Sequence, residues 1–164
     1  MANTIPVNYE LQFEPLFHNF TFKGMEIITI SLSKATDSII LDAAELKIKK
    51  CHVEQGTKII TAKASLNKKN ERLTVKLTKK IKGKAKLCIK FTGVLNDRLL
   101  GFYKSQYKDN RGKTKYLATT QFEAADARRA FPCWDEPAVK ATFDVSLLVD
   151  RHHDAISNMS VISK

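Results

Sequence analysis

The 164-residue sequence lacks the features that mark secreted and membrane-spanning proteins. Its three cysteines, Cys51, Cys88 and Cys133, are an odd number without a C-x-x-C pair, which argues against a disulfide framework and a thiolate zinc site. No stretch approaches the roughly 20 apolar residues that cross a bilayer, and residues 1–9 lack the charged and apolar regions of a signal peptide. We therefore expect reduced thiols, no membrane partner and a cytoplasmic location.

Helical periodicity is also missing. Apolar and polar residues alternate in runs of five to eight, as in 7–13, 73–77 and 87–91, and turn-forming residues recur about every ten positions. This pattern predicts an all-β fold, an antiparallel β-sandwich or saddle-like sheet. A chain of this length can bury roughly 70 per cent of its unfolded surface. We therefore expect residues 1–164 to form a single domain.

Three details of the strand pattern are specific enough to test. The polar run 33–37 predicts a turn between strands at 25–32 and 38–41, and residues 155–162 are a last candidate strand. Between Leu46 and Val53 the alternation slips by one residue. A β-bulge near Lys49 and Lys50 is the simplest way to keep the apolar side chains on one face.

Positive charge is unevenly distributed along the chain. Residues 45–90 contain 15 Lys and Arg against 3 Asp and Glu, a net charge of +12, whereas the whole chain carries +11. Such a face can attract nucleic acid or an acidic partner. It can equally be a solvated sheet face that blocks edge pairing. The stretch has no Phe, Tyr or Trp on which bases could stack, so we expect nucleic acid not to be a partner.

The segment 119–143 differs from the rest, because it concentrates acids, arginines and the only tryptophan. Its residues 117–122 are typical of a strand, and a short helical turn near residues 124–131 should end before Pro132. Gln121 and Glu123, two positions apart, would then project from one face. A carboxylate beside a carboxamide suits an ammonium group with a peptide bond behind it. Spacing alone favours the alternative, an ion pair of Glu123 with a nearby arginine.

Asp135 and Glu136 follow Trp134 directly. Adjacent carboxylates cannot readily face each other across a substrate, which argues against a glycosidase-like pair. We expect these acids to pair with Arg128 and Arg129 and the aromatic residues of the segment to serve in packing.

The segment 120–143 resembles the signature of the zinc aminopeptidases related to aminopeptidase N and puromycin-sensitive aminopeptidase. The similarity continues along the chain in the order of that family, in the runs IPVNYEL from Ile5, FKG from Phe22, LDAAEL from Leu41, FTGVLND from Phe91, GFYKS from Gly101, TQFEAADARRAFPCWDEPAVKATF from Thr120 and AISNMSV from Ala155. The resemblance implies an N-terminal β domain that contributes a loop to the active site of a neighbouring catalytic domain. It also implies that Glu123 holds the free α-amino group of a peptide and that Gln121 contacts its first residue.

The catalytic motifs of that family are not in these 164 residues. Neither H-E-x-x-H nor G-x-M-E-N occurs, and the four histidines, His18, His52, His152 and His153, suit polar surface positions. We therefore expect no catalytic residue and no metal in this chain. Zinc would belong to the catalytic domain of a longer parent enzyme, which would be this domain's partner together with the peptide. We expect the chain alone to be inactive, because it would end before the catalytic domain.

Two other functions stay open. One is a basic β-sheet module that binds nucleic acid or an acidic partner, and the other is a scaffold domain that docks other domains.

Overall fold

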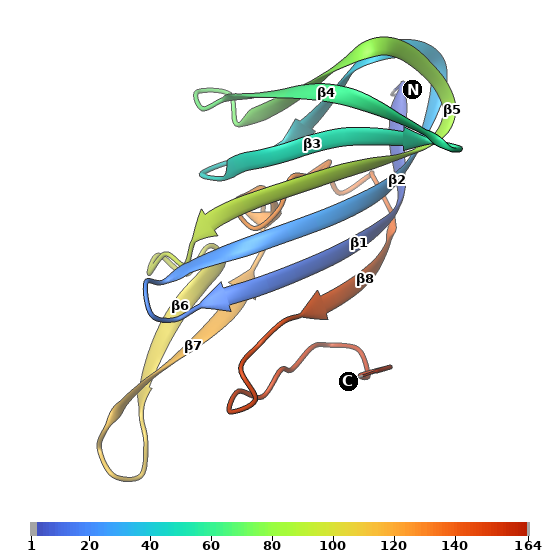
Figure 1. Ribbon diagram of the computed structural model, residues 1–164. Helices are drawn as coiled ribbons and strands as arrows, with labels where there is room; N and C mark the ends of the chain where they lie inside the picture. The colour runs from blue at the N-terminus through green and yellow to red at the C-terminus, as the bar shows by residue number, and fades with distance from the viewer. Residues whose placement is uncertain (1–2, 164) are drawn as a thin grey trace.

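The computed structural model describes residues 3–163, and almost all of its regular structure is β-strand (Figure 1). The elements are β1 (Thr4–Leu16), β2 (Thr21–Asp42), β3 (Lys47–Gln55), β4 (Lys58–Asn67), β5 (Arg72–Val94), β6 (Gly101–Lys108), β7 (Thr114–Gln121), the 3-10 turn η1 (Ala127–Arg129) and β8 (Thr142–Leu147). The all-β prediction and the short helical turn near residues 124–131 are both confirmed.

Six strands form one mixed sheet in the order β3-β4-β5-β2-β1-β8, and β6 pairs with β7 in a separate two-stranded sheet. The pairs within the large sheet are antiparallel except for β1 with β8, which are parallel. A parallel pair needs a long connection, and here the chain between the two strands supplies most of the domain. The first strand of the domain therefore lies beside its last.

β2 and β5 are long strands that bend together. The turn predicted at residues 33–37 is not formed, because these residues continue β2 and shift its register against β5 on either side of Thr36. Opposite them, Ile81 pairs with Thr36 and Gly83 has a φ of +86°, which a glycine adopts without strain. Matching irregularities in both strands let the pair curl without separating. The polar residues alone predict a turn, because the sequence does not show that they pair with β5.

The bulge predicted in β3 is confirmed. The register against β5 shifts between Ile48, which is opposite Phe91, and Lys50, which is opposite Lys90. After the shift Cys51 faces Ile89 and Val53 faces Leu87, so the apolar residues of β3 return to the inner face.

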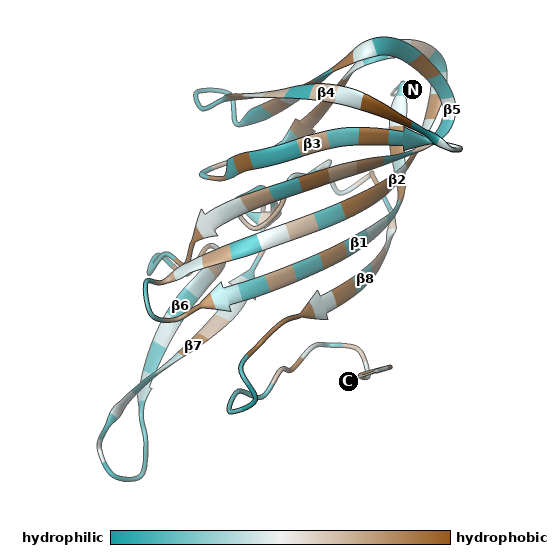
Figure 2. Cartoon of the chain, in the orientation of Figure 1, coloured by the Kyte–Doolittle hydropathy of each residue, from teal (hydrophilic) through white to brown (hydrophobic). Residues whose placement is uncertain are grey.

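The core lies between the inner face of the large sheet and the segment that follows β7. Its aromatic centre includes Phe13, Phe22 and Phe91 from the sheet together with Phe102 of β6 and Phe131 of the later segment. Figure 2 shows the alternation of hydrophobic and hydrophilic residues along the strands that produces this one-sided burial. Gly24 and Gly93 lie directly beneath the rings of Phe91 and Phe22, where a side chain would clash. Gly24 is thus a packing position in β2.

All fifteen basic residues between positions 45 and 90 are exposed. Several of them follow the outer side of β5, where Lys84, Lys86 and Lys90 alternate with the buried Ala85, Leu87 and Ile89. The charge excess of the sequence is therefore a solvent-facing property of the sheet.

The last part of the described chain is exposed. β8 is an edge strand whose six residues are all exposed, and residues 155–162, predicted as a strand, form no strand. No described strand pairs with this segment. Within residues 3–163, no helix is long and apolar enough to span a membrane.

Candidate functional site

Gln121 is the last residue of β7 and lies near the start of the segment 119–143, at the base of the β6–β7 hairpin. The two strands pair in register from Lys108 and Thr114 back to Gly101 and Gln121. Gly101 has a φ of +68°, and a Cβ atom there would lie 2.6 Å from the Cβ of Arg129. The missing side chain thus lets η1 pack against the base of the hairpin.

Glu123 follows two residues later, outside the strand. Gln121 and Glu123 are exposed, whereas Phe122 between them is half-buried and its ring lies 5.9 Å from that of Phe131, edge to face. The peptide bond between Glu123 and Ala124 is cis, and the amide of Asp126 donates to the carbonyl of Phe122 at 2.9 Å. The two predicted side chains are therefore both available to solvent at one end of the hairpin.

Arg128 binds the second half of the segment to the sheet. Its Nε donates to Asp135 Oδ2 at 2.9 Å, and its Nη1 lies 3.4 Å from Glu71 Oε2 and 3.6 Å from the buried Asp42. The predicted pairing of Asp135 with an arginine is confirmed, whereas the exposed Glu136 makes no ion pair among the described residues. Burial lowers the pKa of Arg128, but the hydrogen bond with Asp135 and the attraction of Asp42 raise it overall, so the charge is firmly held.

Arg129 makes a second set of contacts, with Asp126, Glu45 and Glu71. Its Nε donates to Asp126 at 2.8 Å, and its two terminal nitrogens lie 2.7 Å from Glu45 and 3.1 Å from Glu71. Arg98 also pairs with Glu45. Burial opposes the charge of Arg129, yet the hydrogen bond with Asp126 and the attraction of Glu45 raise its pKa overall.

The arginine contacts leave Glu123 apart. Neither arginine pairs with it, and among the described residues Glu123 makes no side-chain hydrogen bond or ion pair. The ion pair that spacing favoured is therefore not formed. Asp126 and Asp135 pair with arginines, while the carboxylates of Glu123 and Glu136 remain free at the surface.

Backbone bonds fix the segment further. The amide of Asp42 donates to the carbonyl of Cys133 at 2.7 Å, and the amide of Cys133 donates to the carbonyl of Asp42 at 3.0 Å. The amide of Ala44 donates to the carbonyl of Arg128 at 2.9 Å. The amide of Trp134 donates to the hydroxyl of Tyr9 at 3.3 Å, and Trp134 packs on the core, as predicted.

Sequence reasoning missed Asp42, Glu45 and Glu71 as partners of the arginines. They lie 57 to 86 positions before Arg128, and only their place at strand ends, brought together by β2 and β5, reveals their role. The signal in the sequence was the LDAAEL run, which contains two of the three.

The thiols of Cys133 and Cys51 are not poised for nucleophilic chemistry. Burial raises the pKa of Cys133 far above its ordinary value and that of Cys51 to about 12. A thiol that stays protonated is a poor nucleophile. The arrangement can hold a cation through Glu123 and hydrogen-bond through Gln121.

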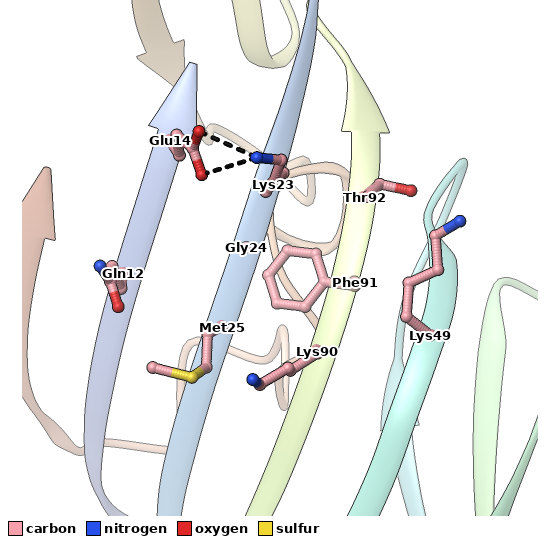
Figure 3. Close-up of a pocket in the computed structure, with 9 residues that line it drawn as sticks. All are labelled: Gln12, Glu14, Lys23, Gly24, Met25, Lys49, Lys90, Phe91 and Thr92. Carbon is pink, nitrogen blue, oxygen red and sulfur yellow. Dashed lines mark hydrogen bonds and ion pairs between the residues drawn. The ribbon is translucent and has the colours of Figure 1, made fainter. Parts of the chain in front are cut away.

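A shallow hollow on the outer face is unrelated to this site. It lies over β1, β2 and β5, where Glu14 and Lys23 bind each other at 2.9 Å beside Met25 and Lys90 (Figure 3). Its carboxylate is already paired, and no residue that lines it belongs to the segment 119–143.

Residues 5–164 match the family described as the peptidase M1 N-terminal domain. The chain belongs to this family. It is 43% identical over 162 residues to puromycin-sensitive aminopeptidase of Caenorhabditis elegans and 42% identical over 161 residues to aminopeptidase 2 of Candida albicans; each alignment covers 97% of this chain and 17% of the relative. It is 39% identical over 166 residues to aminopeptidase M1 of Arabidopsis thaliana, covering 98% of this chain and 19% of the relative.

This M1 N-terminal domain thus spans less than a fifth of the length of the relatives it matches. The relatives bear the names of aminopeptidases, which agrees with the family that the sequence motifs indicated.

Proposed function

We propose that this M1 N-terminal domain anchors the amino terminus of a peptide for a zinc-dependent aminopeptidase. Glu123 accepts hydrogen bonds from the α-ammonium group, and Gln121 contacts the first residue. The observation that carries the proposal is the free, exposed carboxylate of Glu123 just after the β6–β7 hairpin, in a segment where arginines hold the acids Asp126 and Asp135.

The rigidity of the segment supports this role. Arg128 and Arg129 bind it to strand ends of β2 and β5, so an ammonium group would meet a carboxylate whose backbone is already positioned. A charge-assisted hydrogen bond between the two groups selects a free amino terminus over a blocked one.

The hydrolytic step is outside this chain's own residues. A zinc ion would supply the activated water in the parent enzyme, held by a catalytic domain that is the partner of this one. The residues of this chain bind and orient the peptide, so the 164-residue chain alone should not hydrolyse it. A cytoplasmic location stays a prediction, to be checked by microscopy of the tagged full-length protein.

Replacing Glu123 in the full-length protein tests the proposal. We expect Glu123→Gln to lower kcat/KM for peptides with a free amino terminus by roughly 10- to 100-fold, which corresponds to a charged hydrogen bond of about 1.5–3 kcal/mol. Steady-state hydrolysis of an unblocked dipeptide amide measures the loss. The matched control is Glu136→Gln, which changes an exposed acid of the same segment without an ion pair. Equal kcat/KM for Glu123→Gln and the wild type would contradict the role.

The exposed lysine face supports a second candidate, a module that binds nucleic acid or an acidic partner. The absence of aromatic residues between positions 45 and 90 argues against it. Binding of an oligonucleotide with a length or sequence preference, measured by fluorescence anisotropy, would favour this candidate over simple charge attraction.

A further inference from the structure

Three side chains with metal-binding atoms meet on the outer face of the large sheet, far from the segment described above. His52 and Glu54 are two residues apart on β3 and therefore point to the same side. Cys88 of β5 is directly opposite His52 in the antiparallel pair. The donor atoms of the three residues all lie within 4.8 Å of one another, and His52 Nε2 is 3.2 Å from Glu54 Oε1.

We propose that His52, Glu54 and Cys88 bind one zinc-class divalent cation, with water as its fourth ligand. Imidazole nitrogen, thiolate sulfur and carboxylate oxygen are the donors that zinc takes in proteins, and three protein ligands leave one position open. Two ligands at about 2.0–2.1 Å from a tetrahedral ion lie roughly 3.3–3.4 Å apart. The nitrogen and oxygen of His52 and Glu54 are already near that separation.

The backbone around the three residues is well fixed. At His52, β3 lies between two neighbours, since it pairs with Thr61 of β4 and with Cys88 of β5. The ligands therefore come from adjacent strands whose spacing is set by backbone hydrogen bonds. Around tetrahedral zinc the sulfur would lie about 3.6 Å from the other two donors, and all three donor atoms are already within 4.8 Å of one another.

The site is open on one side. The His52 side chain is 26% exposed and that of Glu54 42%, whereas Cys88 is only 9% exposed at the base. An ion can approach from solvent and lose part of its hydration shell against the sheet.

The charges around the site are compatible with a cation. A thiolate and a carboxylate together balance the two positive charges of the ion. Lys86, opposite Glu54 on β5, directs its ammonium group to Glu10 of β1 at 3.5 Å. The cross-strand neighbours of Cys88 on β2 and of Glu54 on β4 are the uncharged Ile27 and Ile59.

This proposal departs from the expectation, drawn from the cysteine spacing, that the chain holds no thiolate zinc site and no metal. Cys88 is 36 positions after His52, and only the pairing of β3 with β5 brings the two together. The proposal concerns this chain's own residues and does not rest on the proposed peptide-anchoring function.

Titration of the 164-residue chain with Co²⁺ in a thiol-free reductant tests the proposal, because a thiolate ligand gives cobalt a charge-transfer absorption band. We expect one Co²⁺ per chain with this band, displaced by one equivalent of Zn²⁺. Cys88→Ser should remove the band and weaken Zn²⁺ binding by at least about 100-fold, since loss of even an outer partner of a metal ligand costs 10- to 100-fold.

Cys51→Ser is the matched control, because it removes the neighbouring thiol on the opposite face of β3 and should keep the band. His52→Gln offers a second variant at a more exposed position and should weaken binding while a thiolate remains. Circular dichroism establishes that each variant is folded. A wild-type chain without the band, or a band that Cys88→Ser and His52→Gln leave unchanged, would overturn the proposal and leave His52 and Glu54 as an ordinary ion pair.

Discussion

At the scale of single residues, Glu26 of β2 is the most unusual side chain of the core. It is fully buried, its cross-strand neighbours are Leu11 and Ile89, and neither carboxylate oxygen has a hydrogen-bond partner among the described residues. Burial raises its pKa well above the ordinary value of 4.5, so the folded domain retains a proton that the unfolded chain loses. Unfolding is therefore favoured by rising pH.

Replacing Glu26 with Met should stabilise the domain, and more so at high pH. We expect the free energy of unfolding to rise by about 1–3 kcal/mol near pH 5, because an unpaired polar group leaves the core. The pKa of Glu26 is higher in the folded domain than in the unfolded chain. The free energy of unfolding of the wild type should therefore fall by up to about 1.4 kcal/mol per pH unit as the pH rises from 4.5 towards the folded pKa. Glu26→Met lacks the carboxyl group and should not show this fall. Urea unfolding at pH 5 and pH 7 measures both effects.

Glu136→Gln, which changes an exposed acid, is the control for Glu26→Met and should show no such difference. If the stability of Glu26→Met changed with pH in the same way as that of the wild type, the result would contradict a buried, protonated Glu26.

Gly101 and Gly112 provide a matched pair for the packing of η1. Both have positive φ, +68° and +73°, but a Cβ at Gly101 would meet Arg129, whereas at Gly112 it would meet nothing within 4 Å. We expect Gly112→Ala to cost about 1 kcal/mol from the backbone alone. Gly101→Ala should cost about 1–3 kcal/mol more from the clash. Thermal unfolding of the two variants measures the difference, and equal losses would contradict the close approach.

At the scale of elements, the arginines of η1 hold the signature segment to the ends of β2 and β5. Arg128 is mostly buried and forms ion pairs with Asp42 and Asp135, which are themselves largely buried. Removal of the cation leaves these carboxylates without their charge partner. The stability of the segment therefore depends on contacts between residues that are distant in sequence.

Arg128→Met should lower the free energy of unfolding by about 2–3 kcal/mol, since it removes charge-assisted bonds in a partly buried site. The control is Arg98→Met, whose ion pair with Glu45 is half-exposed on both sides and should be worth less than about 1 kcal/mol. Chemical denaturation measures both. A loss from Arg98→Met as large as that from Arg128→Met would mean that burial does not decide the strength of these pairs.

The sequence predicted those elements whose cause is local. The alternation in β3 revealed its bulge at Lys49, and Pro132 with the Ala- and Arg-rich run before it indicated the short helical turn. The continuity of β2 through residues 33–37 could not be predicted, because it depends on Ile81 and Gly83 of β5. Residues 155–162 show the opposite error, a candidate strand that no described strand pairs with.

Part of the arrangement around the candidate site followed from the sequence. Gln121 was expected near a strand end, where β7 ends, and Asp135 was expected to pair with Arg128 or Arg129, as it does with Arg128. That Glu123 remains free could not be read from spacing, because the partners that occupy the arginines, Asp42, Glu45 and Glu71, come from other strand ends.

At the scale of the whole molecule, apolar exposure gathers at the C-terminal end. Ile156 and Ile162 are 89% and 94% exposed, and Phe143, Val145 and Leu147 of β8 are also exposed. Exposed apolar residues that gather in one contiguous patch are typical of interaction sites. Since the chain spans less than a fifth of its relatives, a neighbouring domain is the occupant that we propose for this surface.

Substituting Ser for Ile156, Val161 and Ile162 together should reduce the binding of a hydrophobic dye to the isolated chain. The free energy of unfolding should change by less than about 0.5 kcal/mol for each substitution, because these side chains contact little of the core. Dye fluorescence and urea unfolding measure the two quantities. A large loss of stability would show that the segment packs on the domain.

The parallel pairing of β1 with β8 has a consequence for how the chain is made. During synthesis β1 emerges first, yet the strand that covers its free edge begins only at Thr142. Until then the ribosome-bound chain presents an open strand edge, which is a site for wrong pairing. Gln121 and Glu123 emerge shortly before β8, so the edge of β1 stays open until after these two residues have been synthesised. A nascent chain that stalls before Thr142 would keep this edge of β1 unpaired.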